Sequence, residues 1–296
     1  MKTDRVINQP SSPDGAPGVN YDPKVVDGFG SEWQRFDQQA MEHPEARQLF
    51  ERYFAIFPWA SLPANAVGFD AGCGSGRWAR FVAPCVGVLH CVDASADALR
   101  VAARNLSSFG NCRFHLATVD SMPLADGACD FGYSLGVLHH IPDTRSALQA
   151  CVRKLKPGAP FLLYLYYAFD NRPAWFRAIW KVSDGLRTVL SRCPFRVKST
   201  ISDLVALLVY LPLARGARLA ERIGAPVEQI PLSAYRRQSF YVMRTDALDR
   251  FGTRLEKRFT RDEIHRMMEN AGLSHIQFNE APPFWVAVGV RTSAGI

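Results

Sequence analysis

The sequence predicts an α/β protein in which a doubly wound, mostly parallel sheet is flanked by helices. Short apolar or β-branched runs alternate with helical segments from Ala66 to Tyr167. A glycine-rich turn follows the first of these runs, and the alternation resumes near the C-terminal end of the sequence. Because strands joined by helices lie parallel, this order favours a sheet with helices on both faces.

The predicted elements follow these runs in order. Strands are expected near 67–69, 87–92, 112–117, 131–135 and 160–167, and helices near 76–83, 96–106 and 144–155. The motif KLKPG ends the last of these helices with a basic turn and a Pro-Gly stop. In a later helix Thr260 is the predicted N-cap, Glu263 completes a capping box, and Gly272 suits the C-terminus. Two more strands are expected at 274–279 and 284–290.

These elements divide the chain into five parts. Residues 1–24, rich in Pro, Gly, Ser and Asn, are expected to form a flexible arm, and 25–62 a helical cap. The ligand-binding core is expected at 63–168, a helical insertion at 169–254, and the last helix and two strands at 255–296. In the cap, Trp33 and Phe36 either close over the ligand or are core aromatics.

Two stretches of the insertion allow alternative interpretations. LVALLVYLPLA, residues 204–214, is too short to span a bilayer and is expected to be interrupted by Pro212, so a buried helix is favoured over one at a membrane surface. Anionic lipid would suit its basic neighbours, which are Arg192, Arg196, Lys198, Arg215 and Arg218. In YRRQSFYVMRTDALDRFG, residues 235–252, the arginines either bind an anionic acceptor or form solvated ion pairs, and ion pairs are favoured.

Composition excludes several classes of protein. The chain has 296 residues, 48% of them hydrophobic and 21% charged, as in soluble globular proteins. The net charge of +7 is diffuse and forms no extended basic run, which gives little support to nucleic-acid binding. Seven scattered cysteines without a CxxC pair suit a reducing compartment, and with no signal peptide at the N-terminus a cytoplasmic protein without a structural metal is expected.

The turn in FDAGCGSGRWAR indicates the ligand. Gly72, Gly74 and Gly76 follow Asp70 and are expected to let the backbone approach a ligand closely. A dinucleotide fingerprint needs a further glycine where Arg77 stands. An acid beside the turn is unfavourable for a pyrophosphate, but it suits the ammonium group of S-adenosylmethionine, in a contact worth about 1 kcal/mol. Asp93, about 20 residues on, is placed to accept both ribose hydroxyls of either cofactor.

From these motifs the sequence resembles the class I S-adenosylmethionine-dependent methyltransferases over about residues 67–167. The matching segments are VGFDAGCGSG, VDAS, DSMPLADGACDFGYSLGVLHHIPD and LKPGAPFLLY. The resemblance implies a Rossmann-like fold with a seventh, antiparallel strand, which FWVAVGV at 284–290 fits. It also implies that the long insertion before the last helix covers the substrate, as in many relatives.

The resemblance further implies which residues bind the donor. Asp70 and the three glycines would line its methionine and ribose side, Asp93 would bind the ribose diol, and Leu135 would pass beneath the donor. Thr118, Val119 and Asp120 would flank the adenine. Many relatives have an aspartate at the position of Thr118, so here the adenine contact rests on a hydroxyl, on the backbone or on Asp120.

The motif LHHIPD provides the candidate catalytic residues. His140, and less so His139, could act as a general base if the acceptor must lose a proton, although the same motif could simply hold a turn. Tyr164, Tyr166 and Tyr167 could shape an aromatic acceptor pocket or contact the sulfonium, but packing is favoured for each.

A small-molecule acceptor is expected, methylated on oxygen, nitrogen or carbon. A non-catalytic scaffold is disfavoured because the glycines and Asp93 are intact. Nucleic-acid methylation is disfavoured because no basic stripe with stacking aromatics and no Asn/Asp-Pro-Pro-aromatic motif occurs. Peripheral membrane contact through 204–214 and the oligomeric state stay open.

Overall fold

The structure is a computed structural model that describes residues 20–41 and 43–293. These residues form two compact units. The core unit contains the described residues up to Gln38, Arg47–Ala168 and those from Leu255 on, and the insertion unit contains Gln39–Ala46 and Phe169–Arg254. Each unit is described by itself.

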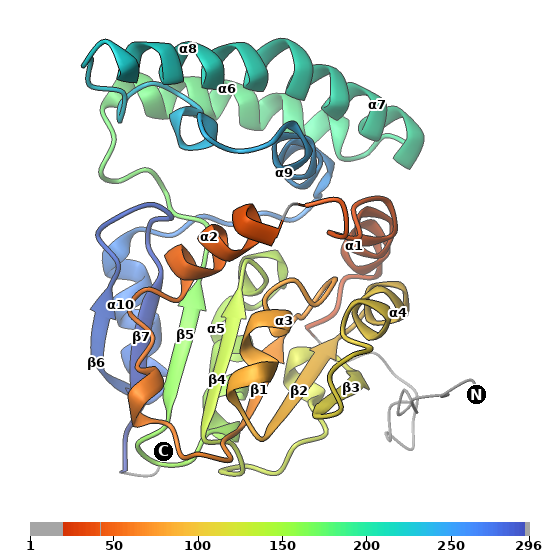
Figure 1. Cartoon of the computed structure of the whole chain (residues 1–296), viewed down its shortest axis with the longest axis vertical. Coiled ribbons are helices and arrows are strands. Elements are labelled where there is room, and N and C mark those ends of the chain that lie inside the picture. The colour runs from red at the N-terminus through yellow and green to blue at the C-terminus, as the bar shows by residue number, and fades with distance from the viewer. Residues whose placement is uncertain (1–19, 42, 294–296) are drawn as a thin grey trace. The chain divides into compact units, whose positions relative to one another are not determined.

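The core unit is built on a seven-stranded sheet (Figure 1). Its strands are β1 (Val67–Ala71), β2 (Val88–Asp93), β3 (Cys112–Leu116), β4 (Phe131–Leu135), β5 (Pro160–Tyr164), β6 (Leu273–Phe278) and β7 (Ala287–Arg291). Their order in space is β3-β2-β1-β4-β5-β7-β6, and β7 runs opposite to the direction of the other six described strands. The predicted mostly parallel sheet and its antiparallel seventh strand are confirmed. The order of strands reverses between β1 and β4, and ligands of such sheets bind beyond the carboxyl ends of the strands at that point.

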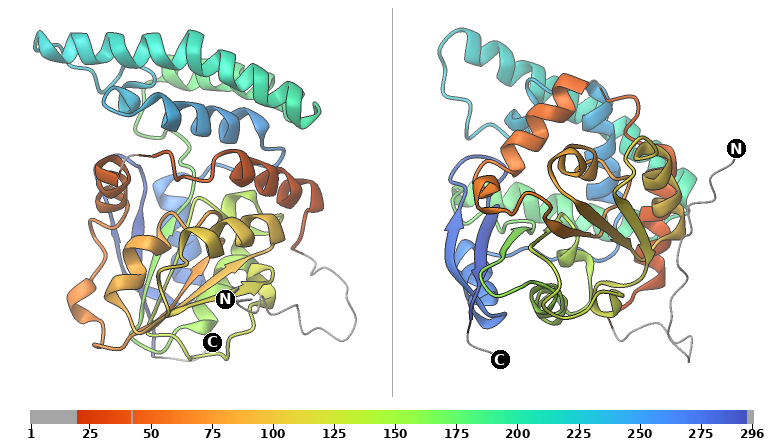
Figure 2. Two further views of the ribbon diagram at one scale, coloured as in Figure 1. Left: turned by 45° about the vertical axis from the view of Figure 1, so that its right-hand side comes forward. Right: turned by 60° about the horizontal axis from the view of Figure 1, so that its bottom comes forward.

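Helices cover both faces of this sheet (Figure 2). They are α1 (Pro23–Arg35), α2 (His43–Tyr53), α3 (Ala79–Val82), α4 (Ala96–Asn105), α5 (Thr144–Lys154) and α10 (Arg261–Asn270). On one face α5 and α10 bury Leu148 and Ile264 against Phe69 and Phe161. On the other, α3 and α4 pack with the aromatic residues that follow α2. Alternate residues of each strand point to opposite faces of the sheet and contribute to the two core layers. A strand with one polar and one apolar face could contribute to only one of them.

Several predicted boundaries are wrong, among them the start of the last strand, which is Ala287 and not residue 284. Helix α1 begins at Pro23, inside the predicted arm, because the Asp22 carboxylate accepts hydrogen bonds from the backbone N–H groups of Lys24 and Val25; residues 1–19 of that arm lie outside the described residues. Helix α3 begins at Ala79 instead of residue 76, because Gly76 has a φ of 76° that no right-handed helix allows. Strand β5 ends at Tyr164, because the chain leaves the sheet to pair Tyr167 with Phe259.

Two glycines in neighbouring strands make room for phenylalanines. A Cβ at position 132 would lie 2.3 Å from Phe69 Cζ, and one at position 68 would lie 2.1 Å from Phe131 Cε1. We expect Gly132→Ala to lower the free energy of unfolding by about 1–3 kcal/mol, because both rings are fully buried and cannot move aside. Urea denaturation measures this. Gly110→Ala is the control, since no atom lies within 4 Å of its added Cβ; equal losses in both variants would contradict the packing argument.

The insertion unit is helical. It contains α6 (Ala174–Leu190), α7 (Phe195–Val205), the π-helical segment η5 (Ala206–Tyr210), α8 (Leu211–Arg222) and α9 (Phe240–Gly252). Contrary to the prediction, Pro212 does not interrupt the apolar stretch, since one helix runs without a break from Phe195 to Arg222. The wider π turn directly before Pro212 accommodates a residue that lacks an N–H group and whose ring crowds the preceding turn.

This helix was also expected to be buried, which is wrong for one of its faces. Ala206, Tyr210 and Ala214 pack in a small core with Met243 and Ala247 of α9. Leu208, between them in sequence, has 68% of its surface exposed. The 28-residue helix is long and apolar enough to cross a membrane by length and composition, a test that core helices of soluble proteins also pass.

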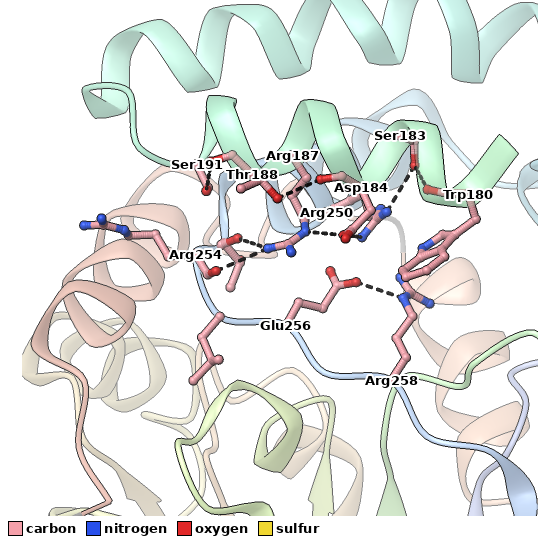
Figure 3. Close-up of polar contacts among 12 residues, drawn as sticks. Trp180, Ser183, Asp184, Arg187, Thr188, Ser191, Arg250, Arg254, Glu256 and Arg258 are labelled. Carbon is pink, nitrogen blue, oxygen red and sulfur yellow. Dashed lines mark hydrogen bonds and ion pairs between the residues drawn. The ribbon is translucent and has the colours of Figure 1, made fainter. Parts of the chain in front are cut away.

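Ion pairs hold the insertion unit together on its polar side. Asp184 of α6 pairs with Arg187 at 2.7 Å and with Arg250 of α9 at 3.6 Å (Figure 3). The arginines of 235–252 all have acidic partners within this unit, in the pairs Arg236–Glu221, Arg237–Glu221, Arg244–Asp203 and Arg250–Asp184. The favoured interpretation of that segment, ion pairing, agrees with these contacts.

Candidate functional site

The glycine turn connects β1 to α3 at the carboxyl edge of the sheet. Gly72, Gly74 and Gly76 have φ angles of 81°, 54° and 76°, which favour glycine strongly. The structure adds a second reason for these glycines. A Cβ added to Gly72, Gly74 or Gly76 would meet Val137, Trp33 or Leu106. The glycines are therefore required by the backbone conformation and by protein packing, and the turn offers backbone N–H groups to a ligand.

Asp70 lies at the end of β1 with an unsatisfied carboxylate oxygen. Its Oδ2 is buried and has no hydrogen-bond partner among the described residues. Burial raises the pKa of Asp70 to about 8, while the nearby Tyr133 hydroxyl acts in the opposite direction. A cationic group placed against this carboxyl would stabilise its charged form, because opposite charges at close range offset desolvation. The site therefore fits the ammonium group of S-adenosylmethionine.

Asp93, at the end of β2, ties the turn to the next strand. Its Oδ2 accepts a hydrogen bond from Gly74 N at 2.9 Å, and its Oδ1 accepts one from Ser95 N at 2.8 Å. Burial raises the pKa of Asp93, and these backbone bonds oppose that effect. Each carboxylate oxygen has a further lone pair. Asp93 can therefore fix the turn and still accept the two hydroxyls of a ribose.

The segment after β3 lies beside Asp93, since Ala117 N donates to the Asp93 carbonyl at 3.0 Å. The Thr118 hydroxyl is 2.7 Å from the Ser121 hydroxyl. The side chain of Val119 is buried in the core, so only its backbone can face a ligand. Of the three predicted adenine neighbours, Asp120 therefore offers the strongest acceptor for an amino group.

The Leu135 side chain, predicted to pass beneath the donor, lies in the core layer formed with α3 and α4. The next residue, Gly136, has a φ of 79° and open space where a Cβ would stand. A contact with the donor at this position would involve the backbone at residues 135 and 136 and not the leucine side chain.

His139 and His140 form a short 3₁₀ turn, η4 (Leu138–His140), after β4. His139 is fully buried, and neither of its ring nitrogens has a hydrogen-bond partner among the described residues. Its ring centroid lies 4.0 Å from those of both His140 and Tyr166. Burial, with the charges of His140 and Arg258, lowers the pKa of His139 well below its usual range. His139 is therefore a neutral packing residue, which argues against a role as base.

His140 is oriented by the backbone of the core unit. Its Nδ1 lies 2.6 Å from the carbonyl oxygen of Leu255. Because a carbonyl oxygen only accepts hydrogen bonds, Nδ1 carries the proton, and Nε2 of the neutral ring keeps its lone pair. The ring of Phe29 lies 4.9 Å away, centroid to centroid. His140 is thus held in the tautomer that a base acting through Nε2 requires.

Sequence reasoning missed the residues that reach this turn from distant parts of the chain. The guanidinium of Arg258 lies 5.1 Å from the centre of the Tyr166 ring and pairs with Glu256 at 2.8 Å (Figure 3). Lys257 N donates to the His139 carbonyl at 3.1 Å. More than a hundred residues separate 256–258 from the histidines, and no local pattern signals such a contact.

The three tyrosines have different surroundings. Tyr166 stacks on His139, whereas Tyr167 packs beside Phe284 at 5.5 Å between ring centroids. Tyr164 meets Tyr53 edge to face at 5.1 Å. Only Tyr166 therefore lies with the histidines, and packing explains the other two.

Helix α1 brings Trp33 over the glycine turn. The Arg77 guanidinium lies 5.7 Å from the Trp33 ring and 4.4 Å from the Trp78 ring. Helices α1 and α4 lie side by side (Figure 2), and a Cβ on Gly30 would come within 2.7 Å of Ser95 Oγ. Phe36, in contrast, is buried. Of the two alternatives for the cap aromatics, Trp33 fits the first and Phe36 the second.

Comparison with known proteins agrees with this geometry. Residues 69–163 match the family model described as methyltransferase domain. The chain is 32% identical over 100 residues to phosphoethanolamine N-methyltransferase 2 of Caenorhabditis elegans, covering 33% of this chain and 23% of that protein. It is 30% identical over 121 residues to the ubiquinone biosynthesis O-methyltransferase of Thiobacillus denitrificans, covering 39% and 50%.

A third relative extends the similarity. The ubiquinone biosynthesis O-methyltransferase of Sodalis glossinidius is 28% identical over 191 residues, covering 62% of this chain and 74% of that protein. The chain thus spans half or less of the first two relatives. Residues 69–163 of this chain are therefore similar to methyltransferase domains, in agreement with the resemblance to the class I S-adenosylmethionine-dependent methyltransferases.

Proposed function

We propose that this protein transfers a methyl group from S-adenosylmethionine to a small-molecule acceptor. The observation that carries the proposal is the buried, unsatisfied Asp70 carboxyl beside a turn of three glycines with positive φ. That pairing suits a cationic amino acid joined to a nucleoside and disfavours linked phosphates. The names of the three relatives, one for N-methylation and two for O-methylation, also refer to small molecules.

The bound donor supplies an electrophilic methyl group on a sulfonium. The chain's own residues bind and orient the donor and the acceptor. Asp70 and Asp93 hold the two polar ends of the amino-acid nucleoside, and alignment of donor and acceptor provides much of the acceleration. His140 Nε2 accepts the proton of an acceptor hydroxyl, while neutral His139 and Tyr166 form an apolar wall that excludes water. The Phe29 ring packs against His140, so it must shift when an acceptor reaches this base.

The acceptor is a lipophilic biosynthetic intermediate in this proposal, and the protein acts in the cytoplasm with a peripheral membrane contact through 204–214. Exposed leucines in that stretch support the contact, because a soluble helix normally hides them. The ubiquinone biosynthesis relatives support a lipophilic acceptor.

Calorimetric titration with S-adenosylmethionine, S-adenosylhomocysteine and NAD tests the donor site. We expect Asp93→Ala to weaken binding of S-adenosylhomocysteine by about 1–3 kcal/mol, because a buried hydrogen-bonding partner is lost. Asp130→Asn is the matched control, since Asp130 also accepts a backbone N–H, from Val67 at 2.9 Å, but at the opposite edge of the sheet. Binding of NAD in place of the sulfur compounds, or unchanged affinity in Asp93→Ala, would reject the assignment.

Transfer of a labelled methyl group to fractionated cell extract then tests the reaction. Label in small organic-soluble molecules supports the proposal. Label confined to nucleic acid, or none despite tight donor binding, contradicts it.

A further inference from the structure

The exposed apolar side chains of this protein are confined to one part of the chain. Among the described residues, every exposed large hydrophobic side chain lies between Trp175 and Ile223. They are Trp175, Ile179, Val182, Leu186, Val189, Val197, Leu204, Leu207, Leu208, Val209, Leu213, Leu219 and Ile223, which we call the insertion surface. The core unit, although much larger, contributes none in its described part. Clustered exposure of this kind marks an interaction site.

The arrangement within α6 is regular. Trp175, Ile179, Val182, Leu186 and Val189 follow one another at steps of four, three, four and three residues, so they lie along one face of the helix. Between 50% and 72% of the surface of each is exposed. The opposite face carries the Asp184 and Arg187 ion pair (Figure 3). Helix α6 therefore has one face that is satisfied inside the unit and one continuous apolar face that is not.

The net charge of the chain comes from the same segment. Residues 169–254 contain 15 of the 35 Lys and Arg residues but only 7 of the 28 Asp and Glu residues, giving +8, whereas the rest of the chain has −1. Asp184, Asp203 and Glu221 are used in internal ion pairs.

The basic residues near the insertion surface are not neutralised. Six of them are exposed, and none forms an ion pair with a described acidic residue: Arg177, Lys181, Arg192, Arg196, Arg218 and Arg222. Two neighbours that the sequence grouped with them serve the fold instead. Lys198 is buried and donates to the Gly252 carbonyl at 2.8 Å, and Arg215 donates to the carbonyls of Arg236 and Gln238.

We infer that the insertion surface docks in the plane of a membrane that contains anionic lipid. Apolar side chains flanked by unpaired cations match the boundary between acyl chains and anionic headgroups. A second copy of this chain fits less well, since it would bring six uncompensated cations against six others. Docking in the plane is favoured over spanning, because the long helix carries the Asp203–Arg244 ion pair and packs one face on α9.

This inference specifies the lipid and the surface for the membrane contact in the proposed function, but it does not depend on methyl transfer. Co-sedimentation of the full chain with vesicles tests it without an activity assay. We expect the protein to bind phosphatidylcholine vesicles that contain 30 mol% phosphatidylglycerol, a content chosen to give the surface anionic charge. Partition to vesicles of phosphatidylcholine alone, or to the mixed vesicles in 0.5 M salt, should be at least tenfold weaker.

Two pairs of substitutions separate the apolar and the electrostatic contributions. Val182→Asp with Leu186→Asp, and separately Arg177→Glu with Lys181→Glu, should each lower the vesicle partition at least tenfold. Arg266→Glu is the matched control, because Arg266 is an exposed, unpaired arginine of α10 in the core unit. The vesicle partition of this variant should differ from that of the wild type by less than twofold. Thermal unfolding shows that each variant is folded; the chosen side chains are exposed, so the Tm should be kept.

Equal partition of the variants and the wild type would overturn the inference. So would vesicle binding that is indifferent to phosphatidylglycerol, or a dimer in sedimentation that the aspartate variants convert to a monomer. Loss of vesicle binding with donor binding intact rejects only the docking surface, whereas loss of donor specificity with vesicle binding intact rejects only the methyl-transfer proposal.

Discussion

Replacement of His140 by alanine is expected to slow turnover at saturating donor by about 10²- to 10⁴-fold, the usual contribution of a general base. The reason is the hydrogen bond that His140 Nδ1 donates to the Leu255 carbonyl oxygen, with 2.6 Å between nitrogen and oxygen. This bond keeps the proton on Nδ1 and leaves Nε2 as the acceptor. Donor affinity should stay within about twofold, because the proposed donor contacts are at Asp70 and Asp93. Single-turnover rates with labelled donor, together with calorimetry, separate the two effects.

A matched control for this variant is His265→Ala, which removes a partly exposed imidazole of α10 that contacts Glu269 and the Phe278 ring. Its turnover should equal that of the wild type. Added imidazole should partly restore His140→Ala, because a small base can enter the space that is left. An unaffected rate in His140→Ala would show that the acceptor loses its proton without help from the protein, as expected for an amine that is already neutral.

Replacement of Asp70 by asparagine is expected to change the pH dependence of stability. In the unfolded chain this carboxyl ionises near its ordinary pKa of 3.8, whereas burial raises its pKa in the fold to about 8. The folded state therefore holds a proton that the unfolded state has lost. The stabilisation from the protonated carboxyl is complete below pH 3.8 and is lost as the pH rises to about 8. Above that pH the free energy of unfolding no longer changes through this group.

The wild type should accordingly lose roughly 2–4 kcal/mol of unfolding free energy relative to Asp70→Asn between pH 5 and pH 8. Urea denaturation of the two proteins without donor measures this difference. The donor should show the reverse trend. Its affinity for the wild type should rise with pH up to about 8, since an ammonium binds the ionised carboxyl, and Asp70→Asn should lack that rise. Parallel stability curves for the two proteins would contradict a raised pKa at Asp70.

Much of the core unit could be predicted because its signals are local. Strand β4 begins at Phe131 and helix α5 at Thr144, as the apolar and helical runs predict, and the capping box of Thr260 and Glu263 forms as expected. The glycine turn and Asp93 were found by spacing alone. Periodicity, capping and positive φ are properties of a few consecutive residues, so the sequence displays them directly.

Contacts between distant segments could not be predicted. The contact of Arg258 with Tyr166 has no sequence signal, because it joins elements that meet only after the sheet has formed. The packing of Val137 and Leu106 against the glycines has no sequence signal either, since both residues approach the turn from other parts of the fold.

The sequence by itself determined the mostly parallel sheet, the glycine turn with its two aspartates and the apolar, basic character of the insertion, since each is set by nearby residues. Tertiary structure decided that, of two adjacent and buried histidines, only His140 has a ring nitrogen held by a backbone carbonyl, and it decided which apolar side chains of the insertion stay exposed. The burial of a side chain and its contact partners depend on how the folded elements pack, so the order of residues along the chain does not reveal them.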